Sequence, residues 1–322
     1  MNLLVSMRYL VALDEHQHFA RAAQACFVTQ PALSNAIRAL EEEFGAVLVK
    51  RSRSFAGFTP EGQRMLASAR RLLHEQELLA QDFKSSQGKP AGTLALGAVP
   101  TAEPIAARFA AMLQARHPGI RPVVRIMSSP DIEAGLENLS LDLGLGFTDR
   151  PRPATFLALP QYAEHYFWVS KADQLGKAEK ASSAKPKQGL HIGQPMSWQE
   201  AAQSPLCLMT PEMHNRRIVD AAFAKAGTPV TPVMETSSIL TLALSLMSGS
   251  VSCIMPGALV GAFRAHAELQ ARSLVSPEVH TPVGFMALKT ERTSRTLDAA
   301  LTLAQDAAWL RHAAAHSGLL SA

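Results

Sequence analysis

The stretch that decides the fold is residues 29–45, TQPALSNAIRALEEEFG. It predicts a single helix with both of its ends marked. Thr29 can cap the first turn, Pro31 suits a first-turn position because its missing N–H has no partner there, and Gly45 is typical just past a helix end. Its apolar residues recur at helical spacing and form one stripe, which consists of Leu33, Ile37 and Leu40.

The first half of this helix carries small polar side chains where a surface helix usually carries Lys and Glu. A short Ala-rich segment and a tight turn precede it, and together they predict a helix-turn-helix whose second helix can lie in a DNA major groove. The amides of Gln30 and Asn35 can pair with adenine, and Ser34 can donate or accept a hydrogen bond. Arg38 lies one turn beyond Ser34 and can reach a base or a phosphate.

The segment that follows, VLVKRSRSFAGFTP, predicts a small basic hairpin that acts as a wing beside the duplex. Between Phe44 and Leu73 the only acid is Glu61, against six basic residues, Lys50, Arg51, Arg53, Arg64, Arg70 and Arg71. We expect phosphate contacts from the wing bases, since phosphates are bound mainly by Lys and Arg. From this pattern alone, DNA binding and an ordinary solvated basic loop both stay open.

A family resemblance decides between these two readings. FARAAQACFVTQPALSNAIRALEEEFGAVLVKR, followed by GFTPEGQRML, resembles the N-terminal domain of LysR-type transcriptional regulators almost position by position. Cys26, Val49 and Phe58 depart from the family's usual Leu, Phe and Leu, and each exchanges one apolar residue for another at an expected core position. The residues that the resemblance and the helix-turn-helix pattern assign to DNA are Thr29, Gln30, Pro31, Ser34, Asn35, Arg38, Lys50, Arg51 and Arg53.

The resemblance also implies the assembly and the domain order. It implies an α+β multidomain chain with a winged helix-turn-helix over residues 1–59 and a dimerisation helix and linker over 60–91. A homodimer or homotetramer would then face an inverted-repeat promoter site on double-stranded DNA, because a two-fold protein reads a two-fold site.

Composition is compatible with this organisation. The chain has 322 residues, 47% hydrophobic and 18% charged, which indicates about two domains, and its net charge of +4 is too mild to prove a nucleic-acid partner. Three widely separated cysteines without a CxxC pattern argue against a disulfide framework or a zinc site and suit a reducing cytoplasm. We expect no signal peptide, no membrane span and no membrane partner.

From Thr93 onward, apolar strand-like runs alternate with helical stretches, which is typical of parallel α/β units. This half resembles the family's two-lobed, periplasmic-binding-protein-like effector domain, with a small ligand between the lobes. The expected domain covers residues 92–305. Lobe one would comprise 92–165 and 270–300, lobe two 166–265, and a C-terminal tail 306–322. Residues 171–197 are polar and rich in Lys, Ala and Ser, and predict an exposed insertion.

Hydroxyl residues recur just after the strand-like runs, at the expected helix starts where unpaired N–H groups favour anions. With their polar neighbours they predict a cleft for a small polar or anionic metabolite. The candidate effector-binding residues are Pro100, Thr101, Ser128, Ser129, Thr148, Thr210, Asn215 and Ser237. Arg216 is a further candidate for a carboxylate contact. For each hydroxyl residue, simple helix capping stays open as an alternative.

No catalytic motif supports an enzyme. GxSxG, HExxH, P-loop and GxGxxG patterns are absent, and His191, His214 and His280 stand isolated in the sequence. We expect a non-enzymatic protein without a cofactor or a metal. Glu41 to Glu43 are interpreted as a solvated face, and Cys207 and Cys253 as buried and inert rather than redox-active. The alternative function is a solute-binding protein or small enzyme that retains a non-functional helix-turn-helix.

Overall fold

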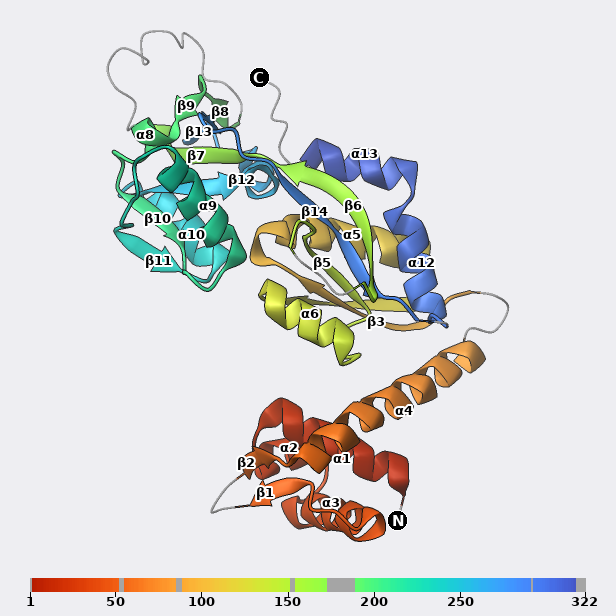
Figure 1. Ribbon diagram of the computed structural model, residues 1–322. Coiled ribbons are helices and arrows are strands. Elements are labelled where there is room, and N and C mark those ends of the chain that lie inside the picture. The colour runs from red at the N-terminus through yellow and green to blue at the C-terminus, as the bar shows by residue number, and fades with distance from the viewer. Residues whose placement is uncertain are drawn as a thin grey trace. The chain divides into compact units, whose positions relative to one another are not determined.

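The computed structural model describes residues 2–51, 55–84, 89–150, 154–172, 189–290 and 292–316. Two compact units divide the chain (Figure 1). The first is built mainly from residues 1–89, and the second from residues 90–136, 141–292 and 296–322.

The first unit is a helical domain with a small hairpin. In chain order it contains α1 (Leu3–His16), α2 (Phe19–Ala25), α3 (Gln30–Phe44), β1 (Val49–Arg51), β2 (Phe55–Phe58) and α4 (Pro60–Lys84). β1 and β2 pair antiparallel, and their hairpin precedes the long helix α4. The predicted winged helix-turn-helix with a long following helix is therefore confirmed.

Helix α3 forms for the reasons that its sequence indicates. The Thr29 hydroxyl accepts a hydrogen bond from the N–H of Ala32 at 3.3 Å, and Gly45 ends the helix with a left-handed φ of 60°. The predicted apolar stripe is fully buried against α1, α2 and the wing: Leu33, Ile37 and Leu40.

The acidic end of α3 is more than a solvated face. Glu41 is partly buried, and its Oε1 accepts hydrogen bonds from the N–H groups of Leu48 at 2.9 Å and Val49 at 3.2 Å. The interpretation of Glu41 as merely solvated is therefore wrong. This carboxylate ties the end of α3 to the first strand of the wing, whereas Glu42 and Glu43 are exposed.

Lobe one of the second unit contains a sheet with the strand order β4-β3-β5-β14-β6. Its strands are β3 (Gly92–Ala98), β4 (Ile120–Ile126), β5 (Leu143–Phe147), β6 (Phe156–Glu164) and β14 (Thr281–Leu288). β3 runs parallel to β4 and β5, as the alternating pattern predicts, while β14 runs antiparallel to β5 and β6. The accompanying helices are η2 (Pro100–Ala102), α5 (Glu103–Arg116), α6 (Ser129–Glu137), α12 (Arg295–Ala304) and α13 (Ala307–His316).

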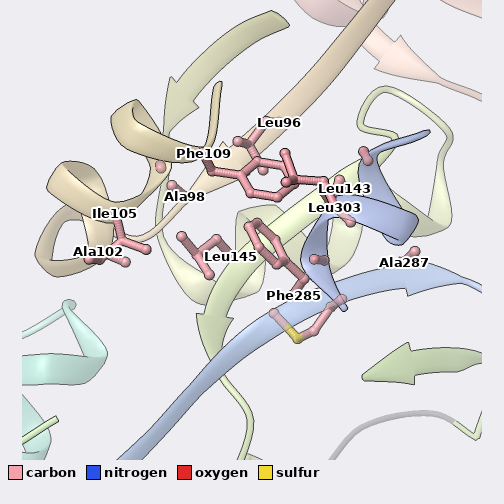
Figure 2. Packing of buried hydrophobic residues seen from close by; sticks show 14 of the residues in the cluster. Leu96, Ala98, Ala102, Ile105, Phe109, Leu143, Leu145, Phe285, Ala287 and Leu303 are labelled. Atoms are coloured by element: carbon pink, nitrogen blue, oxygen red, sulfur yellow. The ribbon is translucent and has the colours of Figure 1, made fainter. Parts of the chain in front are cut away.

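The core of lobe one centres on Phe109 of α5 (Figure 2). Its ring lies 4.3 Å from that of Phe285 and 5.0 Å from that of Trp309 between centroids. Trp309 belongs to α13 and is fully buried, so residues 307–316 are part of the lobe where the sequence suggested a tail. Residues 317–322 of that expected tail lie outside the described residues.

Lobe two contains a sheet with the strand order β11-β10-β12-β7-β13-β8, with β9 pairing β13. Its strands are β7 (Tyr166–Lys171), β8 (His191–Ile192), β9 (Met196–Ser197), β10 (Leu206–Met209), β11 (Met234–Thr236), β12 (Ser252–Pro256) and β13 (Leu269–Val275). The helices are α8 (Trp198–Ala201), α9 (His214–Lys225), α10 (Ile239–Ser248), α11 (Gly257–Val260) and η4 (Gly261–Phe263). One core packs α10 and α11 on one face of the sheet, and another packs α8 and α9 on the other.

The chain passes between the lobes at His165 and again over residues 276–280. The return to lobe one therefore starts after Val275, later than the expected residue 270, because β13 pairs with β7 over residues 269–273 and with β9 at Leu274 and Val275. Residues 173–188 of the predicted polar insertion, and residues 85–88 of the predicted linker, lie outside the described part of the chain.

Candidate functional site

The first candidate site is the outer face of α3 with the neighbouring wing. Gln30, Pro31, Asn35 and Arg38 are exposed, whereas Ser34 is partly buried. These side chains share the face opposite the buried stripe, so a groove could receive them together. Thr29 is exposed, but its hydroxyl already accepts the capping hydrogen bond at the start of the helix.

The wing adds positive charge beside this face. Lys50 is exposed on β1, and Arg51 ends the same strand. Arg53 lies outside the described residues, as does the side chain of Arg51. Phe27, which the sequence analysis did not single out, stands in the turn before α3 with 96% of its surface exposed and a left-handed φ of 56°. Few large apolar side chains of this chain are so exposed. Phe27 lies in a turn, where no helical or strand periodicity in the sequence would have singled it out.

The second candidate site is a cavity between the two lobes of the second unit. Its volume is about 10 Å³, which is room for about one water molecule. Residues from both lobes line it: Val99, Pro100, Thr101, Ser128, Ser129, Phe147, Met209, Met213, His214 and Asn215. The cavity lies where strands end and helices begin, since η2, α6 and α9 start at Pro100, Ser129 and His214.

The structure brings together five of the eight effector-binding candidates in this lining, namely Pro100, Thr101, Ser128, Ser129 and Asn215. The other three are absent from the lining. The Thr148 hydroxyl donates to the carbonyl of Pro282 at 3.4 Å, and the Thr210 hydroxyl donates to Glu212 Oε1 at 2.7 Å. Ser237 is exposed on the segment between β11 and α10.

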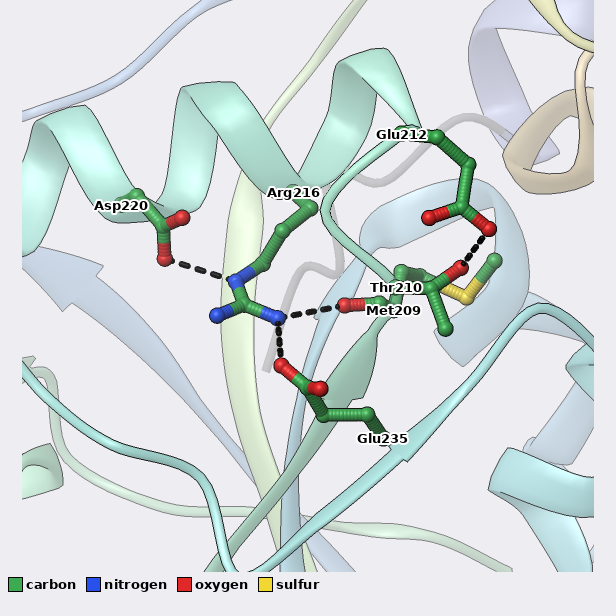
Figure 3. Close-up of polar contacts among 6 residues, drawn as sticks. All are labelled: Met209, Thr210, Glu212, Arg216, Asp220 and Glu235. Carbon is green, nitrogen blue, oxygen red and sulfur yellow. Dashed lines mark hydrogen bonds and ion pairs between the residues drawn. The ribbon is translucent and has the colours of Figure 1, made fainter.

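Arg216 also points elsewhere (Figure 3). Its Nε donates to Asp220 Oδ1 at 2.7 Å, and its Nη1 donates to Glu235 Oε1 at 2.6 Å and to the carbonyl of Met209 at 2.8 Å. The guanidinium thus ties α9 to the sheet of lobe two. It is a structural ion-pair centre, and the suggested carboxylate contact from Arg216 is not supported.

Among the polar residues of the lining, His214 is the one that sequence reasoning missed. Its ring packs against Phe147 with centroids 4.8 Å apart, and its Nδ1 lies 3.2 Å from Nη1 of Arg150. Burial, followed by the charge of Arg150, lowers the pKa of His214 below its usual range. Arg150 is itself held by Glu133, whose Oε1 accepts from Nε at 3.0 Å.

Two further contacts meet at the hydroxyl of Tyr166, one within lobe two and one that connects the lobes. Asn215 Nδ2 donates to the hydroxyl of Tyr166 at 3.4 Å, and that hydroxyl lies 3.3 Å from Thr281 Oγ1. Tyr166 belongs to β7 and Thr281 to β14, so the pair bridges the two points where the chain crosses between lobes. Together with Arg150 and His214, these contacts hold the cavity closed.

Neither site has the groups that a metal centre requires. Within the described residues no cluster of three or more His, Cys, Asp or Glu side chains could hold a metal ion. In the same part of the chain, no helix is both long and apolar enough to cross a membrane.

The chain thus combines two parts, a winged helix-turn-helix with an exposed polar face on α3 and a two-lobed α/β unit with an interlobe cavity, and this is the class of helix-turn-helix proteins with a second, cavity-bearing domain. Residues 4–63 match the family described as bacterial regulatory helix-turn-helix protein, lysR family, and residues 87–309 match the LysR substrate binding domain. The chain belongs to the LysR family.

The curated relatives match this chain over only part of their own length. The hydrogen peroxide-inducible genes activator of Haemophilus influenzae is 34% identical over 176 residues, covering 52% of this chain and 58% of that protein. The DNA-binding transcriptional dual regulator OxyR of Escherichia coli is 36% identical over 138 residues, 42% of this chain and 45% of that protein. The alignments therefore span about half the length of these relatives.

Solved structures support the fold over nearly the whole chain. A full-length OxyR variant from Pseudomonas aeruginosa superposes with a TM-score of 0.67 at 23% identity, covering 93% of this chain and 96% of that one. Full-length CbnR complexed with its target DNA superposes with a TM-score of 0.63 at 20% identity, covering 97% and 99%. At these identities the likeness concerns the fold alone.

Proposed function

We propose that this protein is a sequence-specific, DNA-binding transcriptional regulator whose activity is controlled by a small polar or anionic molecule bound between its two lobes. The observation that carries the proposal is the outer face of α3. Gln30, Asn35 and Arg38 are exposed there, while the opposite stripe is fully buried. A helix with this division of faces can enter a major groove without losing its own packing.

The proposed contacts divide into two kinds. Gln30, Ser34 and Asn35 would read base edges, since amides and hydroxyls can match the donor and acceptor pattern in the major groove. Lys50 and the other wing bases would hold the phosphates and set the register without reading sequence. A protein that binds DNA in this way acts where the chromosome lies, in the bacterial cytoplasm.

Helix α4 supports a homodimer. Leu72, Leu79 and Phe83 are exposed on it, at spacings of seven and four residues that place them on one helix face. A second copy of the same helix is a suitable partner for this face, and the resulting two-fold axis would present two reading helices to an inverted repeat. A tetramer would join two such dimers.

The interlobe cavity supports control by a small molecule. Polar and apolar side chains from both lobes meet in it, which is the usual construction of a ligand site between domains. A molecule that bound there would contact both lobes and could therefore shift their relative arrangement.

Several relatives carry the name hydrogen peroxide-inducible genes activator, which raises the question of an oxidant-sensing thiol. In this chain Cys207 and Cys253 are partners on neighbouring strands β10 and β12, and both are fully buried in an apolar core. The hydrogen bond between the two thiols lowers the pKa of Cys207 and raises that of Cys253. Neither thiol is exposed to an oxidant in solution, so control by a bound molecule is the better supported function.

The alternative, a solute-binding protein or small enzyme with an inactive helix-turn-helix, is not favoured. Such a protein would not need an exposed polar face on α3. The family match over residues 4–63 includes α3, and Gln30, Asn35 and Arg38 are exposed on that helix. We propose a regulator without an enzymatic activity.

Footprinting of the purified full chain on the DNA upstream of its own gene tests the proposal. We expect protection of an inverted repeat, and its absence there would count against the function. Thr101→Val should leave the footprint in place and weaken the response to the effector, because Thr101 lines the cavity and lies outside the first unit. Ser237→Ala is the matched control, since Ser237 does not line the cavity.

A further inference from the structure

We infer that the ligand of the interlobe cavity carries a carboxylate on a small apolar body, and that His214 selects it by donating its Nε2–H. The inference rests on the proposed function, because it concerns the same cavity, and it adds the chemical class of the ligand and a specificity-determining residue.

Three unpartnered polar atoms meet at the cavity. Thr101 Oγ1, Ser129 Oγ and His214 Nε2 are buried and have no hydrogen-bond partner among the described residues, and all three residues line the cavity. Thr101 is 1% exposed and Ser129 is 4% exposed. Buried polar groups are almost always hydrogen-bonded in folded proteins. Three such atoms from three different elements line one cavity, so a molecule that bound there would find three hydrogen-bond partners.

The tautomer of His214 follows from its neighbour. A guanidinium has only donors, so Nδ1 of His214 accepts from Arg150 Nη1 at 3.2 Å and cannot carry the ring proton. The proton of the neutral ring therefore lies on Nε2, the unpartnered atom. Glu133 holds Arg150 in place from the other side at 3.0 Å.

The charged groups around His214 favour the neutral ring. Burial, Arg150 and Arg217 lower its pKa, while Asp149 and Glu133 act in the opposite direction. The net direction is downward, so the ring stays neutral at pH 7 and offers one donor to the cavity. Arg150 is thus a positioning residue that acts through His214.

The backbone points to an anion as well. α9 spans twelve residues, begins at His214, and has no side-chain cap at its N-terminus. The N–H groups of Arg216 and Arg217 already donate to the carbonyl of Met213, and the helix dipole favours negative charge at this end. α6 also starts at the cavity, with Ser129. The hydroxyls of Thr101 and Ser129 can donate or accept, so the group that favours an acceptor is the Nε2–H of His214.

The remaining lining sets the shape of the ligand. Val99, Phe147, Met209 and Met213 form apolar walls, and the cavity volume of about 10 Å³ means that any ligand larger than water must separate the lobes to enter. A short monocarboxylate that separates the lobes slightly would place its oxygens among the donors and its carbon body against these walls.

The test compares carboxylates with amides of the same shape on the full chain. Acetate, propionate and benzoate are titrated against acetamide, propionamide and benzamide, and melting is followed by tryptophan fluorescence. The carboxylates should bind at least about tenfold more tightly than their amides, because an amide NH₂ meets donors and a charged acceptor makes the stronger hydrogen bonds. Equal binding of acid and amide, or binding of neither, would overturn the inference.

Variants separate the roles of the residues. His214→Leu should remove the preference for carboxylates, and His191→Leu, the same change at a residue outside the cavity, should preserve it. Nitrogen-15 NMR of the imidazole should find the His214 proton on Nε2 in the unaltered chain and a mixture of tautomers in Arg150→Met. A proton on Nδ1 in the unaltered chain would refute the assignment whatever the ligand data show.

A DNA mobility assay in the same titrations keeps this inference apart from the proposed function. If the chain gives a footprint and no carboxylate binds, the inference about the ligand fails and the proposed function as a DNA-binding regulator is retained. If propionate binds through His214 and DNA binding is unchanged, the inference stands and control of DNA binding from this cavity fails.

Discussion

Replacing Glu164 by Gln should change how the stability of the second unit depends on pH. Glu164 ends β6 at the crossover between the lobes and is fully buried. Tyr162 Oη donates to its Oε1 at 3.4 Å, while Oε2 has no hydrogen-bond partner among the described residues. Burial raises the pKa of this carboxyl from 4.5 to about 8, so the folded protein keeps the proton at neutral pH.

The direction of the effect follows from proton linkage. The folded state holds the proton up to about pH 8, whereas the unfolded chain releases it near 4.5. The contribution of Glu164 to the free energy of unfolding is therefore fully present below the unfolded pKa and is lost as pH rises through the folded pKa. At ~1.36 kcal/mol for each tenfold change in proton affinity, the loss between about pH 5 and about pH 9 is roughly 4 kcal/mol.

The chain offers a specific probe for this measurement. Its three tryptophans, Trp168, Trp198 and Trp309, are all buried in the second unit, so their fluorescence follows the unfolding of that unit in urea. Glu164→Gln should make the free energy of unfolding less dependent on pH over this same pH range, because the amide does not titrate. Glu212→Gln is the control: Thr210 and the backbone lower the pKa of that exposed carboxyl, so its removal acts only at acid pH. Parallel pH profiles for the unaltered chain and Glu164→Gln would refute this account of the buried carboxyl.

Three further predictions concern the proposed regulator. Asn35→Ala should relax the sequence preference at one base pair, at a cost of about 1–3 kcal/mol in binding free energy. Lys50→Ala should weaken binding to all DNA and reduce the slope of log affinity against log salt concentration by about one. Binding isotherms at several salt concentrations measure both effects. Leu79→Lys should move the chain toward monomers in sedimentation experiments, because it places a charge on the exposed apolar face of α4. In the native chain a thiol reagent should react with Cys26 and gain two further sites only after denaturation, since the other cysteines are buried; fast reaction of all three would contradict the packing.

Much of the fold could be predicted because local signals and tertiary packing agree. In α3, the cap at Thr29, the stop at Gly45 and the buried stripe all indicate the same helix, and the structure contains it with these bounds. Capping and periodicity are short-range properties, so a sequence displays them directly. Trp309 could not be placed in this way, because the expected tail around it carries no strong pattern and the residue packs against Phe109 of α5 and donates to Gln161 of β6.

The site was predictable in part for the same reason. Hydroxyl residues after strands mark the ends of parallel strands, and five of the eight candidates meet at the cavity. Asn215 and Arg216 show where this reasoning stops. Successive residues of a helix point about 100° apart, so Asn215 faces the cavity while Arg216 turns to Asp220 and Glu235. A sequence that places the two side by side does not separate these directions.

His214 was beyond sequence reasoning because its partner is 64 residues away on the other lobe. An isolated histidine gains its role only when the crossovers at His165 and residues 276–280 bring the lobes together. The same closure leaves a cavity of about 10 Å³, so any ligand larger than water must move the lobes apart to enter. It can shift their arrangement only by as much as it binds the opened form better than the closed one. The contacts that resist opening are those of Arg150 with His214 and of Tyr166 with Thr281. A carboxylate that hydrogen-bonds the unpartnered atoms would supply the difference. An apolar molecule of the same size would not, because it leaves Thr101, Ser129 and His214 without partners in the opened cavity as in the closed one.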